Sequence, residues 1–462
     1  MHSAPHVKHL HILGIGGTFM GGLAQIARQM GYKVTGQDRP LYPPMSTQLA
    51  QADISVRAMD DVSFVAEQPD MIVVGNVMTR GMSAVEALLE SGLPFISGPA
   101  WLADVALAGK WVLAVSGTHG KTTTSSMLAW ILEDAKLSPG FLIGGVPANF
   151  GVSARWSDSP FFVVEADEYD SAFFDKRAKL VHYKPRTWVL NNLEFDHADI
   201  YDNLAQIQRQ IHHGVRLVPA SGLLIAPQDD TGVAGALALG YWSGVETTQP
   251  NGTLGWSWQL LTDDASAFVV LLDGAEVGRV HWQLMGEFNI RNALHAIAAA
   301  RHAGVPVSVA CDALSRFAGV ARRLTLLSDA NADVLVYEDF AHHPTAIAVT
   351  LQGLRARYPN RRLIAVVEPR SNSMRMGVFK DALPASLSVA DVVLMYRDAS
   401  WDWQIPEAAF TQSLTICQSY DALLTSVADM VQAGDVLVCM SNGGFGGVPA
   451  RVAKLIATRS VA

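Results

Sequence analysis

The sequence is poor in cysteine and has no long hydrophobic run. Its 462 residues include three cysteines, Cys311, Cys417 and Cys439, with neither paired nor metal-type spacing. This excludes a disulfide framework and favours a reducing compartment. No stretch of about 18 apolar residues predicts a transmembrane helix, and the first residues lack the pattern of a secretory signal. We therefore expect a cytoplasmic protein with no membrane contact.

Charge is also scarce, and positive charge most of all. Only 17% of the residues are charged, and the formal net charge is −9. Such a balance argues against a nucleic acid as partner, because nucleic-acid-binding surfaces are strongly basic. A small anionic substrate remains possible, since a few local basic groups are enough to hold it.

The length and the apolar pattern predict a multidomain α/β protein. A chain of this length exceeds a single compact core and predicts about three domains. Short apolar runs alternate with amphipathic segments, which favours mostly parallel sheets covered by helices. We place the domains at 1–110, 111–328 and 329–462.

Each domain has its own set of predicted elements. The first domain contains strands at 9–15, 33–38, 71–76 and 94–98 and helices at 21–31 and 83–92. The second contains strands at 111–117, 161–167 and 187–192, a helix from 122, a β-rich section at 220–285 and a helix at 289–304. The third contains strands at 333–341, 362–370, 391–396 and 435–444. Polar loops follow the apolar strands, and ligands bind at that edge of open α/β sheets.

The segment "VSGTHGKTTT" lacks one glycine of the common phosphate-binding loop. Val115 stands where the pattern G-x-x-x-x-G-K-[ST] has its first glycine. The remaining features agree with phosphate binding, because a buried strand leads into a glycine-containing loop and a helix begins at Lys121. Lys121 suits the β- and γ-phosphates, and the Thr122 hydroxyl suits Mg²⁺. The alternative is an ordinary strand–turn–helix.

Two acidic segments follow buried strands of the same domain. "EADEYD" carries Glu165, Asp167, Glu168 and Asp170, which repel one another unless a cation is present. "NNLEFDHADIYD" places His197 among acidic side chains, which favours a metal-binding or general-base role. The other polar residues of that segment are Asn192, Glu194, Asp196 and Asp199. We predict a Mg²⁺ site, and the alternative is a solvated acidic loop.

A glycine-rich turn follows the first strand. Gly14, Gly16 and Gly17 resemble a dinucleotide-binding fingerprint, with Asp38 at the end of the second strand. Phe19 occupies the position of the third glycine, so the motif indicates a phosphate-bearing ligand without specifying it. A nicotinamide dehydrogenase is one alternative, but it leaves the Gly-Lys-Thr loop unexplained.

Two further segments in the third domain carry candidate residues. "YEDFAHHPTAI" contains Asp339, His342 and His343. Adjacent histidines diverge, and no other histidine or cysteine is well spaced, so we do not predict zinc. "EPRSNSMRMG" places Arg370 and Arg375 after a strand, where they could hold a carboxylate. The alternative is a surface loop.

The motifs together resemble the Mur ligases of bacterial cell-wall synthesis. The similarity covers the whole chain and includes "SGTHGKTTT", "EADEYD", "NNLEFDHAD" and "EDFAHHPTAI". It implies three domains: a UDP-sugar-binding Rossmann-like domain, a central P-loop ATPase domain with a small β-rich part, and a Rossmann-like C-terminal domain that completes the ATP and peptide site. The stretches "FFDKR", "EPRSNSM" and "MSNGGFGG" are similar to the branch that recycles murein peptides.

The resemblance also implies an activity. Members of that branch join L-alanyl-γ-D-glutamyl-meso-diaminopimelate to the lactyl carboxylate of UDP-N-acetylmuramate, through an acyl phosphate that ATP supplies. The expected partners are therefore small molecules: UDP-N-acetylmuramate, the murein tripeptide and ATP, with Mg²⁺ as cofactor. We expect a monomer or weak homo-oligomer. The alternatives are a ligase that adds free L-alanine to the same sugar and a non-enzymatic nucleotide-sugar sensor.

The family pattern assigns roles to individual residues. Lys121, Glu168 and His197 are the expected catalytic residues, and Thr122, Glu168 and His197 are expected to hold two Mg²⁺ ions. Arg370, Ser371 and Asn372 are expected at the peptide. Gly14, Gly16, Gly17 and Asp38 are expected to face the UDP-sugar. The expected ATP contacts are Gly117, Thr118, His119, Gly120, Lys121, Thr122, Thr123, Asn292, Arg323, Asp339 and His342.

The sequence departs from the family pattern at three points. Phe288 stands where the family usually has histidine near the adenine, and its ring could stack on the base. No lysine occurs between Lys184 and Lys380, so the carbamylated lysine of several family members is absent. "EPRS" only partly matches the D-N-P-R motif of the diaminopimelate-adding ligase, and Arg370 could therefore hold a different carboxylate.

Overall fold

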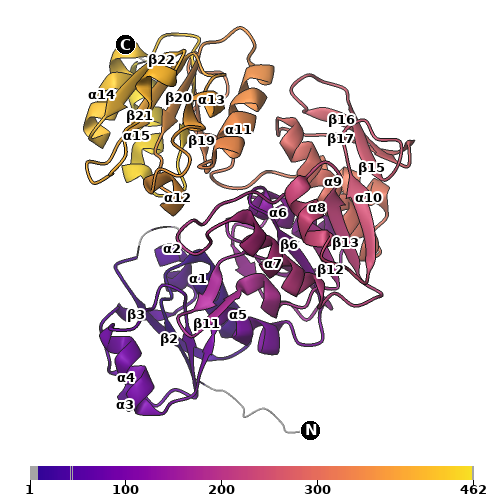
Figure 1. Ribbon diagram of the computed structural model, residues 1–462, viewed down its shortest axis with the longest axis vertical. Coiled ribbons are helices and arrows are strands. Elements are labelled where there is room, and N and C mark those ends of the chain that lie inside the picture. The colour runs from indigo at the N-terminus through magenta and orange to yellow at the C-terminus, as the bar shows by residue number, and fades with distance from the viewer. Residues whose placement is uncertain (1–8, 42, 44, 460–462) are drawn as a thin grey trace.

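The computed structural model describes residues 9–41, 43 and 45–459, and the first eight residues, whose lack of a signal pattern was noted, lie outside these ranges. Figure 1 shows three sheet-and-helix units in chain order. The N-terminal unit is indigo, the central one magenta, and the C-terminal one orange to yellow. The predicted α/β class is confirmed.

The N-terminal unit is a five-stranded parallel sheet with helices on both faces. Its strand order is β3-β2-β1-β4-β5. α1 covers one face through Leu23 and Ile26, and α4 covers the other through Val85 and Leu88. The strands are β1 (His9–Leu13), β2 (Lys33–Asp38), β3 (Ser55–Ala58), β4 (Met71–Val74) and β5 (Phe95–Ser97). The helices are α1 (Thr18–Gln29), α2 (Met45–Gln51), α3 (Phe64–Glu67), α4 (Ser83–Ser91) and α5 (Gly98–Trp101), followed by a π-helical turn at Leu102–Ala106.

The central unit is built on a ten-stranded mixed sheet. Its order is β17-β16-β15-β14-β13-β12-β6-β9-β7-β8, with antiparallel pairs near both edges. Its strands are β6 (Trp111–Ser116), β7 (Gly140–Leu142), β8 (Ala154–Arg155), β9 (Phe161–Glu165), β12 (Thr187–Leu190), β13 (Leu223–Pro227), β14 (Gly244–Thr248), β15 (Trp256–Leu260), β16 (Ala267–Leu272) and β17 (Ala275–His281). A separate hairpin consists of β10 (Asp170–Ala172) and β11 (Asp175–Ala178).

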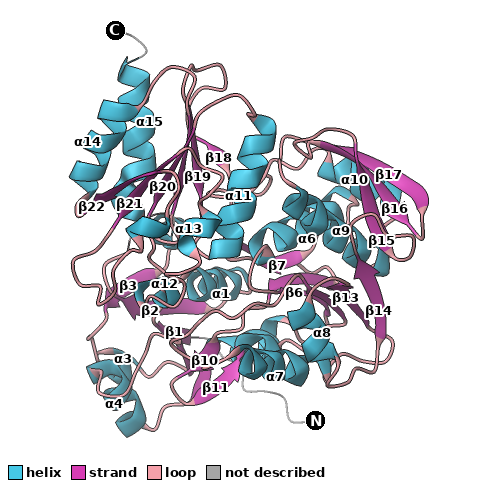
Figure 2. Ribbon diagram, turned by 45° about the horizontal axis from the view of Figure 1, so that its top comes forward, coloured by secondary structure: helices cyan, strands magenta, loops and turns pink. Residues whose placement is uncertain are grey.

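Helices cover both faces of the central sheet. α6 and α9 pack against each other on one face (Figure 2). The other face shares a continuous core with α1 of the N-terminal unit, where Gly22 lies close to Leu142 and Ala154. The helices are α6 (Lys121–Asp134), α7 (Leu204–Val215), α8 (Thr231–Leu237), α9 (Glu287–His302) and α10 (Val307–Leu314). A short 3-10 helix spans Lys179–His182.

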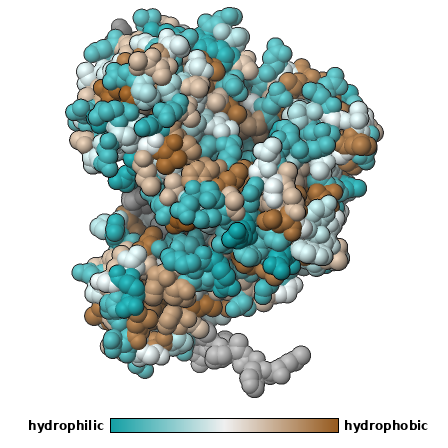
Figure 3. Space-filling view, in the orientation of Figure 1, coloured by the Kyte–Doolittle hydropathy of each residue, from teal (hydrophilic) through white to brown (hydrophobic). Residues whose placement is uncertain are grey.

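The C-terminal unit has a six-stranded sheet of order β18-β19-β23-β20-β21-β22, parallel except for β18. Its strands are β18 (Thr325–Leu326), β19 (Leu335–Asp339), β20 (Leu363–Val367), β21 (Val392–Tyr396), β22 (Ser413–Cys417) and β23 (Val436–Met440). Its helices are α11 (Pro344–Arg357), α12 (Asn372–Arg375), α13 (Leu383–Ser386), α14 (Tyr420–Met430) and α15 (Val448–Arg459), with 3-10 turns at Glu407–Ala409 and Phe445–Gly447. In Figure 3 the surface is notched where the N- and C-terminal units face each other.

Most of the observed strands end earlier than the sequence suggested, whereas β2 and β21 end where predicted. β6 ends at Ser116 and β9 at Glu165, because the glycines and carboxylates that follow leave the sheet to form loops. The section 220–285 contains helix α8 as well as five strands. Among the described residues, no helix is both long and apolar enough to cross a membrane.

Candidate active site

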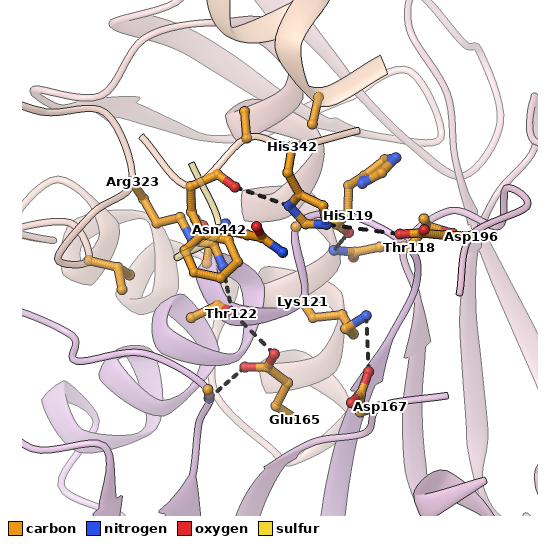
Figure 4. A pocket seen from close by; sticks show the side chains of 18 of the residues that line it. Thr118, His119, Lys121, Thr122, Glu165, Asp167, Asp196, Arg323, His342 and Asn442 are labelled. Carbon is orange, nitrogen blue, oxygen red and sulfur yellow. Dashed lines mark hydrogen bonds and ion pairs between the residues drawn. The ribbon is translucent and has the colours of Figure 1, made fainter. Parts of the chain in front are cut away.

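A cavity of about 920 Å³ lies where the three units meet, and residues of all three line it. Gly14 and Phe19 come from the N-terminal unit, the loop after β6 from the central unit, and His342 and Arg370 from the C-terminal unit. Figure 4 shows side chains from the central and C-terminal units pointing into this space. The volume is at the upper end of the range for small-molecule sites.

The loop after β6 is held by hydrogen bonds to Asn192, which follows β12. The His119 N–H donates to Asn192 Oδ1 at 2.8 Å, and the Thr118 N–H donates to the Asn192 carbonyl at 3.2 Å. Gly120 has a φ of +76°, and a Cβ there would lie 2.5 Å from Asn292 Oδ1, so this position requires glycine. Residues 118–123 line the cavity, whereas Gly117, also expected at ATP, is not among the lining residues.

Lys121, the first residue of α6, extends toward two carboxylates. Its Nζ lies 3.0 Å from Glu168 Oε2 and 3.4 Å from Asp167 Oδ1. Burial by itself would lower the pKa of Lys121, but Glu168, Asp167 and Glu165 together raise it. The lysine is therefore a fixed positive charge at the end of the loop.

His197 completes a cluster with the same carboxylates. Its Nε2 lies 3.1 Å from Glu168 Oε1, and ligand atoms of Asp167, Glu168 and His197 all lie within 4.8 Å of one another. Burial opposes protonation of this histidine, but the hydrogen bond and charge of Glu168 raise the pKa of His197. Two carboxylates and an imidazole at these separations can hold a divalent cation.

Thr122 lies with a carboxylate that was not among the expected metal ligands, Glu165. Its hydroxyl donates to Glu165 Oε1 at 3.1 Å and accepts from Arg323 Nη2 at 3.1 Å. The second oxygen of Glu165 accepts from the Gly144 N–H at 2.7 Å. The predicted ligands Thr122, Glu168 and His197 thus fall into two neighbouring groups, because Thr122 contacts Glu165 at the end of β9, whereas His197 contacts Glu168 in the following loop.

Three predicted ATP contacts line the cavity with their polar atoms already engaged. Asp339 accepts from the N–H groups of Ala341 and Leu324, both at 2.7 Å, and burial raises the pKa of its carboxyl. His342 Nδ1 lies 3.1 Å from the Phe340 carbonyl. The buried Asn292 accepts from the Thr124 hydroxyl at 3.1 Å. Asp339 therefore also ties the interdomain segment at Leu324 to β19.

Only part of the glycine-rich turn after β1 borders the cavity. Gly14 and Gly17 line the cavity, whereas Gly16 and Asp38 do not. The Gly16 N–H donates to Asp38 Oδ2 at 2.5 Å. Asp38 thus stabilises the turn through this hydrogen bond and does not itself border the cavity.

The loop after β20 docks onto the acidic segment of the central unit. Asn372 Nδ2 donates to Asp199 Oδ2 at 2.8 Å, and the Ser373 hydroxyl donates to Asp196 Oδ1 at 2.6 Å. Arg370, Ser371 and Asn372 all line the cavity. Arg375 is exposed at the end of α12 and is not part of the lining.

Lys179 is a cavity residue that the sequence alone did not single out. Its Nζ lies 3.3 Å from Asp167 Oδ2 and 5.2 Å from the centre of the Phe19 ring. The lysine follows the β10–β11 hairpin, and no spacing in the sequence links it to the loop after β6. The nearest sequence feature that could have indicated this lysine is the stretch "FFDKR", which ends two residues before it and is similar to the murein-recycling branch of the family.

Comparison with known proteins agrees with this architecture. Three family models match consecutive parts of the chain: the Mur ligase family catalytic domain at 9–110, the Mur ligase middle domain at 115–300, and the Mur ligase glutamate ligase domain at 322–443. The chain belongs to the Mur ligase family.

Two curated relatives are similar over nearly their whole length. UDP-N-acetylmuramate–L-alanyl-γ-D-glutamyl-meso-2,6-diaminoheptandioate ligase of Escherichia coli K12 is 52% identical, covering 98% of this chain and 99% of the relative. The Haemophilus influenzae protein of the same name is 49% identical, covering 96% and 98%. The crystal structure of a murein peptide ligase from Psychrobacter arcticus 273-4 has a TM-score of 0.76 at 43% identity, covering 97% of this chain and 98% of that one.

Proposed function

We propose that this chain uses ATP to join L-alanyl-γ-D-glutamyl-meso-diaminopimelate to the lactyl carboxylate of UDP-N-acetylmuramate, giving ADP and phosphate in murein recycling. The observation that carries the proposal is the full-length likeness, at about half identity, to two proteins named for this reaction. The three-sided cavity supports it, because the reaction must bring three anionic substrates together.

The three units take one substrate each in this proposal. Residues 1–110 hold the UDP-sugar through the turn at Gly14 and Gly17. Residues 111–328 hold ATP on the loop 117–123, with Asn292 and Arg323 beside it. Residues 329–462 close the site and hold the peptide through Arg370, Ser371 and Asn372.

Mg²⁺ fits two groups of this cavity. Its preferred ligands are oxygens, which Thr122 and Glu165 offer on one side of Lys121, and Asp167 and Glu168 with His197 on the other. When bound, Mg²⁺ supplies positive charge that neutralises phosphate oxygens. Glu165 and Asp167 are therefore proposed as Mg²⁺ ligands in addition to the expected Thr122, Glu168 and His197.

The chemical difficulty is that a carboxylate is a poor electrophile. The lactyl carboxylate attacks the γ-phosphorus of ATP, and the bond to the bridging oxygen of ADP breaks, leaving an acyl phosphate. Lys121 stabilises the charge that develops on the transferred phosphoryl group. The peptide amine then attacks the acyl carbon, phosphate leaves, and the amine loses a proton.

The C-terminal unit protects this intermediate from water. Ser373 and Asn372 bind the segment 196–199 of the central unit, so the peptide loop closes directly over the cluster at His197. Exclusion of water matters because acyl phosphates hydrolyse readily. We propose a monomer or weak homo-oligomer, since each cavity is built by one chain.

The decisive assay measures phosphate release with purified protein, ATP, Mg²⁺ and UDP-N-acetylmuramate. The tripeptide should stimulate release strongly, and L-alanine at equal concentration should not. Stimulation by L-alanine alone would instead assign the chain to the alanine-adding reaction. Binding of the UDP-sugar without any ATP consumption would favour the sensor.

A further inference from the structure

A second group of metal-ligating side chains lies outside the cluster at His197. His119 of the loop after β6, Glu194 of the segment after β12 and His343 of the C-terminal unit present ligand atoms within 4.8 Å of one another. Glu194 Oε2 lies 3.7 Å from His119 Nε2 and 3.3 Å from His343 Nδ1. The two rings lie with their centres 4.5 Å apart and their planes tilted by 44°.

We propose that His119, Glu194 and His343 form a binding site for a transition-metal ion of the zinc type, which joins the phosphate-binding loop to the C-terminal domain. Zinc binds imidazole nitrogens and carboxylate oxygens at about 2.0–2.2 Å in tetrahedral geometry, which puts neighbouring ligand atoms about 3.3–3.5 Å apart. The two separations from Glu194 are close to this spacing. Two imidazoles and one carboxylate also suit zinc better than Mg²⁺.

The hydrogen bonding of the three groups is incomplete without a cation. His119 Nε2 is buried and has no hydrogen-bond partner. His343 Nδ1 accepts a long hydrogen bond from the Thr345 N–H at 3.3 Å, and it also lies 3.3 Å from an oxygen of Glu194. Two acceptors at that distance repel unless a positive charge lies between them. Because an imidazole nitrogen has one lone pair, a metal ion bound at Nδ1 would replace the long contact with Thr345.

A metal ion at this site would affect the turnover of the enzyme, because the site lies between two domains. Glu194 also accepts from the Thr345 hydroxyl at 2.7 Å, so the contact already joins the central unit to α11. A metal ion there holds the C-terminal domain against the ATP loop. Because substrates enter and products leave when the domains separate, the bound ion slows turnover.

Two variants separate this site from the cluster at His197. In His343→Asn, the asparagine still caps α11 but removes the imidazole ligand. In His197→Ala, the other cluster is disrupted and the proposed site is intact. We expect calorimetric titration with Zn²⁺, in excess Mg²⁺ and without nucleotide, to show one tight site in the wild type and in His197→Ala. In His343→Asn the affinity should fall at least tenfold.

Glu194→Gln provides an independent check, since it keeps an oxygen acceptor for Thr345 and loses the charge. It should weaken Zn²⁺ binding as His343→Asn does, while circular dichroism reports unchanged folding. Tight binding that survives in His343→Asn but disappears in His197→Ala would overturn the proposal. So would Zn²⁺ inhibition of phosphate release that is equally strong in the wild type and in His343→Asn. The titration needs no substrate, so its failure leaves the proposed ligase activity untouched.

Discussion

At the scale of single residues, the site depends on a lysine that is surrounded by carboxylates. Lys121 contacts both Asp167 and Glu168, while Thr122, the next residue, contacts Glu165. Consecutive residues at the start of α6 thus serve two separate groups of oxygens. This arrangement explains why "EADEYD" contains more acidic residues than one cation needs.

Lys121→Ala is expected to lower the rate of ligation by at least about a hundredfold, because stabilisation of the transferred phosphoryl group is lost. Binding of the UDP-sugar should change little, since the turn at Gly14 and Gly17 belongs to the N-terminal unit and Lys121 to the central unit. Steady-state phosphate release and equilibrium binding of UDP-N-acetylmuramate measure the two effects. Lys454→Ala, at an exposed position of α15, is the control. Full activity in Lys121→Ala would refute the assignment.

His197→Ala is expected to raise the Mg²⁺ concentration needed for half-maximal activity by about 10–100-fold. The physical reason is the loss of an imidazole that lies 3.1 Å from Glu168 and orients it. Activity measured over a Mg²⁺ series provides the test, with His213→Ala on the exposed side of α7 as control. An unchanged requirement would remove His197 from the metal site.

At the scale of elements, the turn between β6 and α6 decides the shape of the ATP loop. The turn is shorter than the common phosphate-binding loop, so Val115 remains inside β6. There it is fully buried and pairs with β12 and β9. Position 115 needs no glycine, because it lies within the sheet and the chain leaves the strand two residues later, at Gly117.

Gly120→Ala is expected to raise the KM for ATP strongly. Left-handed backbone costs a non-glycine residue about 1–2 kcal/mol, and the added Cβ would lie 2.5 Å from Asn292 Oδ1. Gly109→Ala is a matched control, since its φ is +74° but no atom lies within 4 Å of the added Cβ. The control should lose stability and keep its KM. Equal KM values for both variants would contradict this account of the loop.

At the scale of the whole molecule, several buried histidines make stability depend on pH. Burial lowers the pKa of His11, His342 and His343 to about 4 and that of His295 to about 3. In the unfolded chain these histidines take up protons near pH 6.5, whereas in the folded chain they remain neutral at that pH. Their contribution to stability is therefore complete above pH 6.5 and is lost as the pH falls toward 4.

The midpoint temperature of thermal unfolding should accordingly decrease as the pH is lowered from 6.5 to 4.5. Each such histidine contributes a slope of about 1.4 kcal/mol per pH unit. His295→Asn removes one of them and should flatten the dependence, although the variant is less stable at pH 7. His213→Asn, at an exposed site, should leave the slope unchanged. A wild-type midpoint that is constant over this range would contradict the expectation.

The sequence by itself determined the class of fold, the family and the nature of the chemistry. Alternating apolar runs have to form buried strands and covering helices, and motifs such as "SGTHGKTTT" keep their residues together along the chain. Local order was therefore enough to predict the loop at Gly120 and Lys121, the acidic segments and the three-domain plan.

The tertiary structure decided which side chains meet. It paired Thr122 with Glu165, placed Lys179 beside Asp167, and used Asp38 and Asp339 to hold backbone N–H groups. It also brought His119 of the central unit to His343 of the C-terminal unit. In our proposal zinc therefore has a site, although the adjacent histidines did not predict one. Such contacts depend on strand order and domain docking, which spacing along a chain cannot encode.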